Sequence, residues 1–199
     1  MQEFWFYIEL GLQHVLDINA YDHILFLAAL ALPFTFKSWK NVLLLATVFT
    51  FTHCLALVFS VYEILVIEAT WIEFLIPVTI VSTALFNLVD SNDKQEDRTI
   101  WFHLLATGFF GLIHGFGFSN YFKMMIMGAE DKLAPLLGFA GGIEISQVII
   151  VLLVLVLAYV VQTILKVKQS IFILVGSILI ILITLPLLYE TFPFKTVKF

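Results

Sequence analysis

Long apolar runs separated by short polar segments make up most of this chain of 199 residues. A helix of about 20 apolar residues crosses the hydrocarbon core of a membrane. Six runs are predicted as membrane-spanning helices, and a shorter apolar segment, 3–15, precedes them. The predicted spans are residues 22–36, 41–62, 71–89, 100–120, 134–165 and 170–189.

The short segment 3–15 differs from the runs that follow it, because a helix of this length reaches only about 20 Å at 1.5 Å per residue. We expect a half-span or interfacial helix here. Asp17-Ile18-Asn19 predicts a turn, since Asp and Asn side chains bond nearby backbone groups and stop helices. Asp22 is then expected as the N-cap of the next helix. The chain therefore opens with a broken helix pair whose break lies near membrane depth.

These elements predict an all-α fold: a polytopic transmembrane bundle of seven helices, with six full spans after the short first helix. Composition agrees, because 61% of the residues are hydrophobic and 13% are charged, against about half and a quarter in soluble domains. Residues 1–199 are expected to form a single integral membrane domain in contact with lipid. The net charge of −5 argues against nucleic acid as a partner, and a homo-oligomer stays open.

Ionisable side chains recur inside these apolar runs, where a charge is costly unless it is paired, hydrated or bound. Helix counting puts His53 about 18 Å and His114 about 21 Å from the predicted inner ends of their helices. Imidazoles with carboxylates are typical ligands of nickel, zinc, copper and iron. The predicted metal ligands are His14, Asp22, His23, His53, His114 and Glu144.

Two amides and several glycines are predicted to support this site. Gln147 shares a helix face with Glu144 and could orient it, and Asn87 is expected to form an interhelical hydrogen bond. Gly111 and Gly115 are spaced for close helix contact. The glycines near His114 and Glu144 are also expected to unwind their helices beside the site.

Five motifs, in order along the chain, resemble those of the HupE/UreJ membrane proteins. They are His14 with residues 22–27 (DHILFL), residues 51–57 (FTHCLAL), Glu73 with Asn87-Leu88, residues 111–118 (GLIHGFGF) and residues 142–147 (GIEISQ). The resemblance implies a membrane protein of six or seven helices, described for some members as a secondary permease for nickel or cobalt.

Two departures bring the chain nearer to the less characterised branch of that family. The spacing from His14 to His23 is longer than in the family's run. In the nickel-permease branch, a further His and an acid follow the His-Gly pair that corresponds to His114-Gly115. This chain has Gly117-Phe118-Ser119 there instead.

Three functions follow from these patterns. The leading hypothesis is a secondary permease for a divalent transition-metal ion (nickel, cobalt or zinc) in a bacterial inner (plasma) membrane. The second is an intramembrane hydrolase with a His/Asp-bound zinc, which a retained stoichiometric zinc would distinguish from a weakly held cargo. The sequence favours transport over enzymatic activity, because it lacks the His-Glu-x-x-His and Gly-x-Ser-x-Gly motifs. The third is a non-catalytic membrane assembly partner, for which the short loops offer little docking surface.

Overall fold

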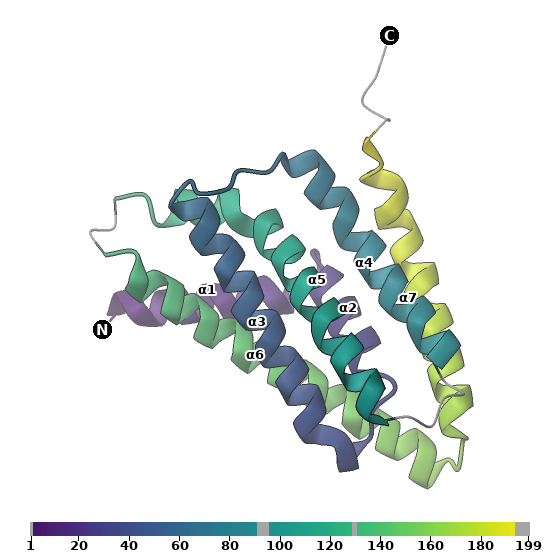
Figure 1. The fold of residues 1–199 in the computed structure, drawn as a ribbon. Coiled ribbons are helices and arrows are strands. Elements are labelled where there is room, and N and C mark those ends of the chain that lie inside the picture. The colour runs from purple at the N-terminus through teal and green to yellow at the C-terminus, as the bar shows by residue number, and fades with distance from the viewer. Residues whose placement is uncertain (1, 91–95, 129–130, 194–199) are drawn as a thin grey trace.

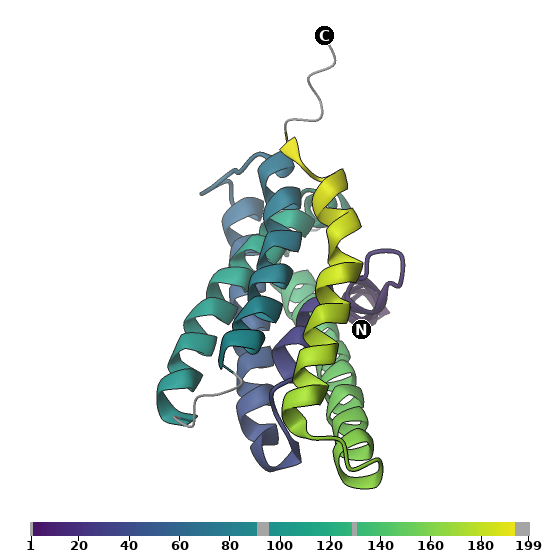
Figure 2. The same cartoon turned by 90° about the vertical axis from the view of Figure 1, so that its right-hand side faces the viewer.

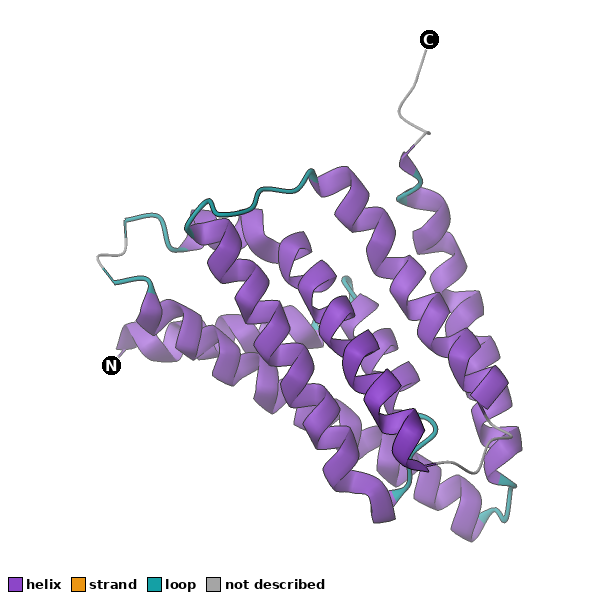
Figure 3. Ribbon diagram, in the orientation of Figure 1, coloured by secondary structure: helices purple, strands orange, loops and turns teal. Residues whose placement is uncertain are grey.

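A computed structural model describes residues 2–90, 96–128 and 131–193, and these residues form a helical bundle without strands (Figures 1 and 3). Four helices that are long and apolar enough to cross a membrane lie in these ranges: Phe36–Val61, Ala69–Val89, Leu133–Ile164 and Gln169–Glu190. The helices are α1 (Gln2–Leu16), α2 (Asp22–Ala31), α3 (Trp39–Val61), α4 (Ala69–Asp90), α5 (Glu96–Met125), α6 (Leu133–Tyr159) and α7 (Gln169–Glu190). A 3-10 turn, Phe36–Ser38, precedes α3, and a π-helical turn, Val160–Ile164, follows α6.

The chain opens with the predicted broken pair of short helices. Between α1 and α2, Asp17 accepts a hydrogen bond from the backbone N–H of Asn19 at 2.8 Å, which confirms the predicted turn. Figure 2 views α1 nearly along its axis, whereas α4 and α7 run up the picture. The first helix thus lies across α4 and α7, and α2 enters the bundle from the turn (Figure 1).

Helix α2 ends at Ala31 rather than at residue 36, and this difference bears on the predicted number of full spans. Pro33 lies two residues beyond the end of α2, and a proline has no backbone N–H with which to continue the helix. A helix of 10 residues covers about 15 Å, half of a hydrocarbon core of about 30 Å. With α1 also short, six full spans are not confirmed. Helix α5 has 30 residues but is not one of the four apolar candidates.

Glycines set the two tightest helix contacts, between α3 and α5 and between α1 and α6. A Cβ at Gly115 would overlap the carbonyl oxygen of His53, and a Cβ at Gly142 would overlap that of Ile8. The predicted close contact at Gly111 and Gly115 is therefore confirmed. The predicted unwinding is wrong, because α5 and α6 stay helical through their glycines. An unbroken helix keeps its backbone hydrogen bonds internal, as a hydrocarbon environment requires.

Helices α4 and α7 lie side by side, and both contact α2 (Figures 1 and 2). Asn87 of α4 donates a hydrogen bond from Nδ2 to the carbonyl oxygen of Ala29 in α2 at 2.7 Å, so the predicted interhelical bond is confirmed. This bond ties α4 to the short helix that carries Asp22 and His23.

Candidate metal centre

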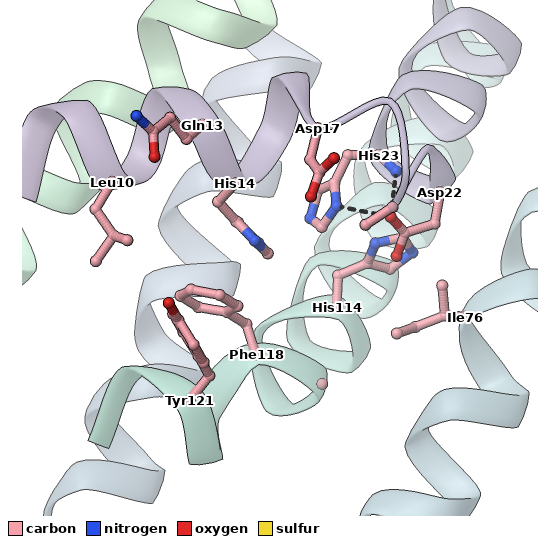
Figure 4. Close-up of a pocket in the computed structure, with 12 residues that line it drawn as sticks. Leu10, Gln13, His14, Asp17, Asp22, His23, Ile76, His114, Phe118 and Tyr121 are labelled. Carbon is pink, nitrogen blue, oxygen red and sulfur yellow. Dashed lines mark hydrogen bonds and ion pairs between the residues drawn. The ribbon is translucent and has the colours of Figure 1, made fainter. Parts of the chain in front are cut away.

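A cavity of about 510 Å³ opens where the break between α1 and α2 meets α4 and α5 (Figure 4). Four of its lining residues are predicted metal ligands. The lining residues are Leu10, Gln13, His14, Asp17, Ala20, Asp22, His23, Ile76, His114, Gly117, Phe118 and Tyr121. The cavity at the break between the two short helices is therefore lined in part by ionisable side chains.

Four histidines from four helices lie close together here, and three of them line the cavity. His14 comes from the last turn of α1, His23 from the first turn of α2, His53 from α3 and His114 from α5. The ring centroid of His23 lies 4.5 Å from that of His14, 5.8 Å from that of His53 and 5.0 Å from that of His114. His14 is half-buried, and the other three are buried. His53 does not line the cavity and is fully covered, so it lies beneath the other rings.

The ligand atoms fall into two overlapping groups that could each hold a metal ion. One group is His14, His23 and His53, and the other is Asp22, His23 and His114. Within each group, one ligand atom per residue lies within 4.8 Å of the others. His23 belongs to both groups. The second group contributes a carboxylate, while the first consists of imidazoles alone.

Several buried imidazole nitrogens in this centre have no hydrogen-bond partner among the described residues. They are His14 Nε2, His23 Nε2, both ring nitrogens of His53, and His114 Nδ1. Leaving a buried polar atom unpaired costs about 1–3 kcal/mol, so a concentration of such atoms needs an explanation. Neutral imidazole nitrogen is a common ligand of zinc, nickel, copper and iron. The donor set therefore fits a transition-metal ion.

Asp22 holds the orientation of the shared histidine. Its Oδ1 accepts hydrogen bonds from the backbone N–H of His23 at 3.0 Å and lies 3.2 Å from His23 Nδ1 (Figure 4). A carboxylate bonded to one nitrogen of a histidine directs the other nitrogen toward a metal. Helix α2 begins at Asp22 itself, and the N-cap residue is Tyr21. The prediction that Asp22 is the N-cap is therefore wrong, and its side chain bonds His23 instead.

Phenylalanines pack around the four rings, and none of them was predicted to have a role. The ring of Phe118 lies 3.8 Å from that of His14, and it stacks in parallel on Phe139 at 5.1 Å between centroids. Phe26 and Phe49 are fully buried and pack against His114 at 5.4 and 5.3 Å. These rings fix the imidazoles and exclude water on the bundle side. The signal in the sequence was Phe118 one turn after His114.

Glu144, the sixth predicted ligand, lies outside both groups. Its Oε1 accepts a hydrogen bond of 2.6 Å from Thr47 Oγ1, and Thr47 is exposed. The cavity lining does not include it.

In the described part of the chain, neither of the two predicted supporting amides forms a hydrogen bond with a predicted ligand. Gln147 is fully buried on α6, and neither polar atom of its side chain has a partner in the part of the chain that is described. Asn87 bonds the backbone of α2 and no ligand side chain. The structure thus brings together five of the six predicted ligands, and Glu144 belongs to neither group.

Comparison with known protein families identifies a family for this chain. The model of the HupE / UreJ protein family matches residues 1–191. No curated protein and no solved structure matches the chain.

Proposed function

This chain belongs to the HupE/UreJ family of membrane proteins related to nickel and cobalt transport, and we propose that it is a secondary permease for a divalent transition-metal ion. The ion, nickel or cobalt, is the cargo. The chain acts as a single integral membrane domain, in a bacterial inner membrane. The proposed ligands are Asp22 and the four clustered histidines.

One observation supports this proposal most: buried imidazole nitrogens without a described partner lie in two groups that share His23. A purely structural cluster would be expected to pair its nitrogens with protein groups. Two overlapping groups suit transport better than storage, because a permeating ion needs several sites of moderate strength rather than one tight site.

The proposed order of binding follows burial and charge. The ion first meets Asp22, His23 and His114, which all line the cavity. The carboxylate offsets part of its charge, which favours capture where water is still near. The ion then stays bound to His23 while it exchanges its other ligands for His14 and the fully covered His53. That second group has no carboxylate, so it binds less tightly and lets the ion leave.

The membrane supplies a driving force for this passage. A potential of 100 mV favours inward movement of a cation by about 2.3 kcal/mol per charge. Protonation of the imidazoles competes with the ion, because only the neutral ring is a ligand. An acidic compartment would therefore empty the site.

The test separates binding from movement. Purified protein in proteoliposomes is assayed for uptake of radiolabelled nickel and cobalt, and the same protein in detergent is assayed for equilibrium binding. His53→Gln removes a ligand from the deeper group only. We therefore expect uptake to fall at least about tenfold, because groups that merely orient ligands already contribute that much. Equilibrium binding is expected to stay within a few-fold of that of the unaltered chain.

Two results would contradict the proposal. The first is folded protein that neither binds nor moves nickel, cobalt or zinc. The second is a His53→Gln protein with unchanged uptake, which would remove the deeper group from the path.

The volume of the cavity supports a second candidate, an intramembrane zinc hydrolase. About 510 Å³ lies in the size range of cavities that hold small molecules, and far exceeds one ion. A zinc on Asp22, His23 and His114 with an open position would activate water. Zinc that stays stoichiometric through dialysis, with no uptake of any metal, would favour this candidate over transport.

A further inference from the structure

Thr79 of α4 is the residue outside the proposed ligand set that bears most directly on the chemistry of the centre. Its Oγ1 lies 3.2 Å from Nε2 of His114 and 2.7 Å from the carbonyl oxygen of Ile76. Thr79 is 3% exposed and His114 is 1% exposed, so water does not compete for these bonds. The hydroxyl belongs to a helix that supplies no histidine to the centre.

The direction of these bonds follows from the number of protons available. A threonine hydroxyl has one proton and can also accept hydrogen bonds. A carbonyl oxygen can only accept, so Thr79 donates its proton to Ile76. Toward His114 the same oxygen must then accept, and the proton in that bond belongs to Nε2.

A neutral imidazole carries a proton on one nitrogen only. If Nε2 of His114 holds it, Nδ1 presents a lone pair. Nδ1 is also the nitrogen of His114 that has no partner in the described part of the chain. His114 forms one of the two groups with Asp22 and His23, whose side chains line the same cavity (Figure 4).

We infer that Thr79 is a positioning residue, which fixes the Nε2–H tautomer of His114 and so presents Nδ1 to the metal ion. Its role in ion binding rests on the proposed function; its role in the tautomer does not. The opposite tautomer would place a donor, Nδ1–H, in a buried site without an acceptor, and would turn the Thr79 proton away from the carbonyl oxygen of Ile76. The hydroxyl thus keeps a ligand nitrogen free in the absence of metal.

The experiment compares three variants of the full chain. Thr79→Val keeps the shape and removes the hydroxyl, and Thr79→Ser keeps the hydroxyl. Thr83→Val is the matched control, because Thr83 is buried on the same helix and donates from Oγ1 to the carbonyl oxygen of Thr79 at 2.9 Å rather than contacting a histidine.

Two readouts are taken. In metal-free protein labelled with 15N-histidine and held in lipid nanodiscs, the signals of His114 are assigned by difference from His114→Gln. The Nε2–H pattern is expected for the unaltered chain, Thr79→Ser and Thr83→Val, and a mixture of tautomers for Thr79→Val. The affinity for Ni²⁺ is expected to fall about tenfold in Thr79→Val alone, the lower end of what groups that orient ligands contribute.

The tautomer readout does not depend on transport. A Thr79→Val protein that keeps the His114 signals of the unaltered chain, or an unaltered chain with the Nδ1–H pattern, overturns the inference. If the unaltered chain binds no metal at all, the proposed function fails, while the nitrogen signals still decide the role of Thr79.

Discussion

Two faces of helix α6 differ in how closely they pack against the neighbouring helices. On one face, Gly142 lies so close to α1 that a Cβ would overlap the carbonyl oxygen of Ile8, and α1 carries His14 into the centre. On the other, a Cβ at Gly141 would have no heavy atom within 4 Å among the described residues, and Glu144 bonds the exposed Thr47.

The comparison teaches that an ionisable group within an apolar helix does not by itself identify a site. Glu144 is half-buried and has a protein partner in Thr47, whereas the four clustered histidines are packed together with nitrogens that no described group bonds. Several unpartnered imidazole nitrogens gathered within reach of one another indicate a site, whereas a single ionisable group does not. Three predictions test this contrast.

The largest effect is expected at the residue that both groups share. His23→Gln removes a ligand from each group while it keeps a polar side chain beside Asp22. We expect nickel affinity to fall more than about 100-fold, since groups that only orient ligands already contribute about 10- to 100-fold. The measurement is equilibrium binding in detergent.

The matched control is His103→Gln, a histidine of α5 that packs between Phe34 and Phe86 and belongs to neither group. Equal loss of nickel affinity in both variants would show that the clustered histidines do not bind nickel more directly than a histidine outside the two groups, and would contradict the assignment of the site.

An intermediate effect is expected from adding one methyl group to either face of α6. Gly142→Ala forces α1 away and shifts His14, so we expect a loss of stability of about 1–3 kcal/mol, typical of overpacking, together with weaker nickel binding. Gly141→Ala has open space and should change stability by less than about 0.5 kcal/mol, as surface substitutions do. Unfolding in mixed detergents measures both. If the two alanines behave alike, the α1–α6 contact does not position the centre.

The smallest effect is expected at Glu144. Glu144→Gln keeps the size of the side chain and an oxygen that can accept the bond from Thr47. Because Glu144 lies outside both groups, nickel affinity should stay within about twofold of the unaltered chain, a difference of less than about 0.5 kcal/mol. A loss comparable to that of His23→Gln would return Glu144 to the ligand set, as the sequence analysis expected, and would break the contrast between the two faces.

Local chemistry explains the features that could be predicted from the sequence. Asp17 and Asn19 stop a helix through bonds to nearby backbone, and the structure has a turn there. Asn87 needed a partner inside the bundle and bonds Ala29. The end of α2 was mispredicted because the apolar pattern continues past Ala31, although Pro33 already marked a boundary.

The centre itself depends on how helices that are distant in the chain meet. The sequence by itself determined that apolar helices carry histidines and carboxylates at similar depth, since hydropathy and helical rise are local properties. Only the tertiary structure decided that His23 joins two groups, that Thr79 meets His114, and that Glu144 bonds Thr47 and joins neither group. Those outcomes depend on helix rotation and on glycine contacts between segments far apart in the chain, and apolar residues on nearly every face of a membrane helix leave its rotation unspecified.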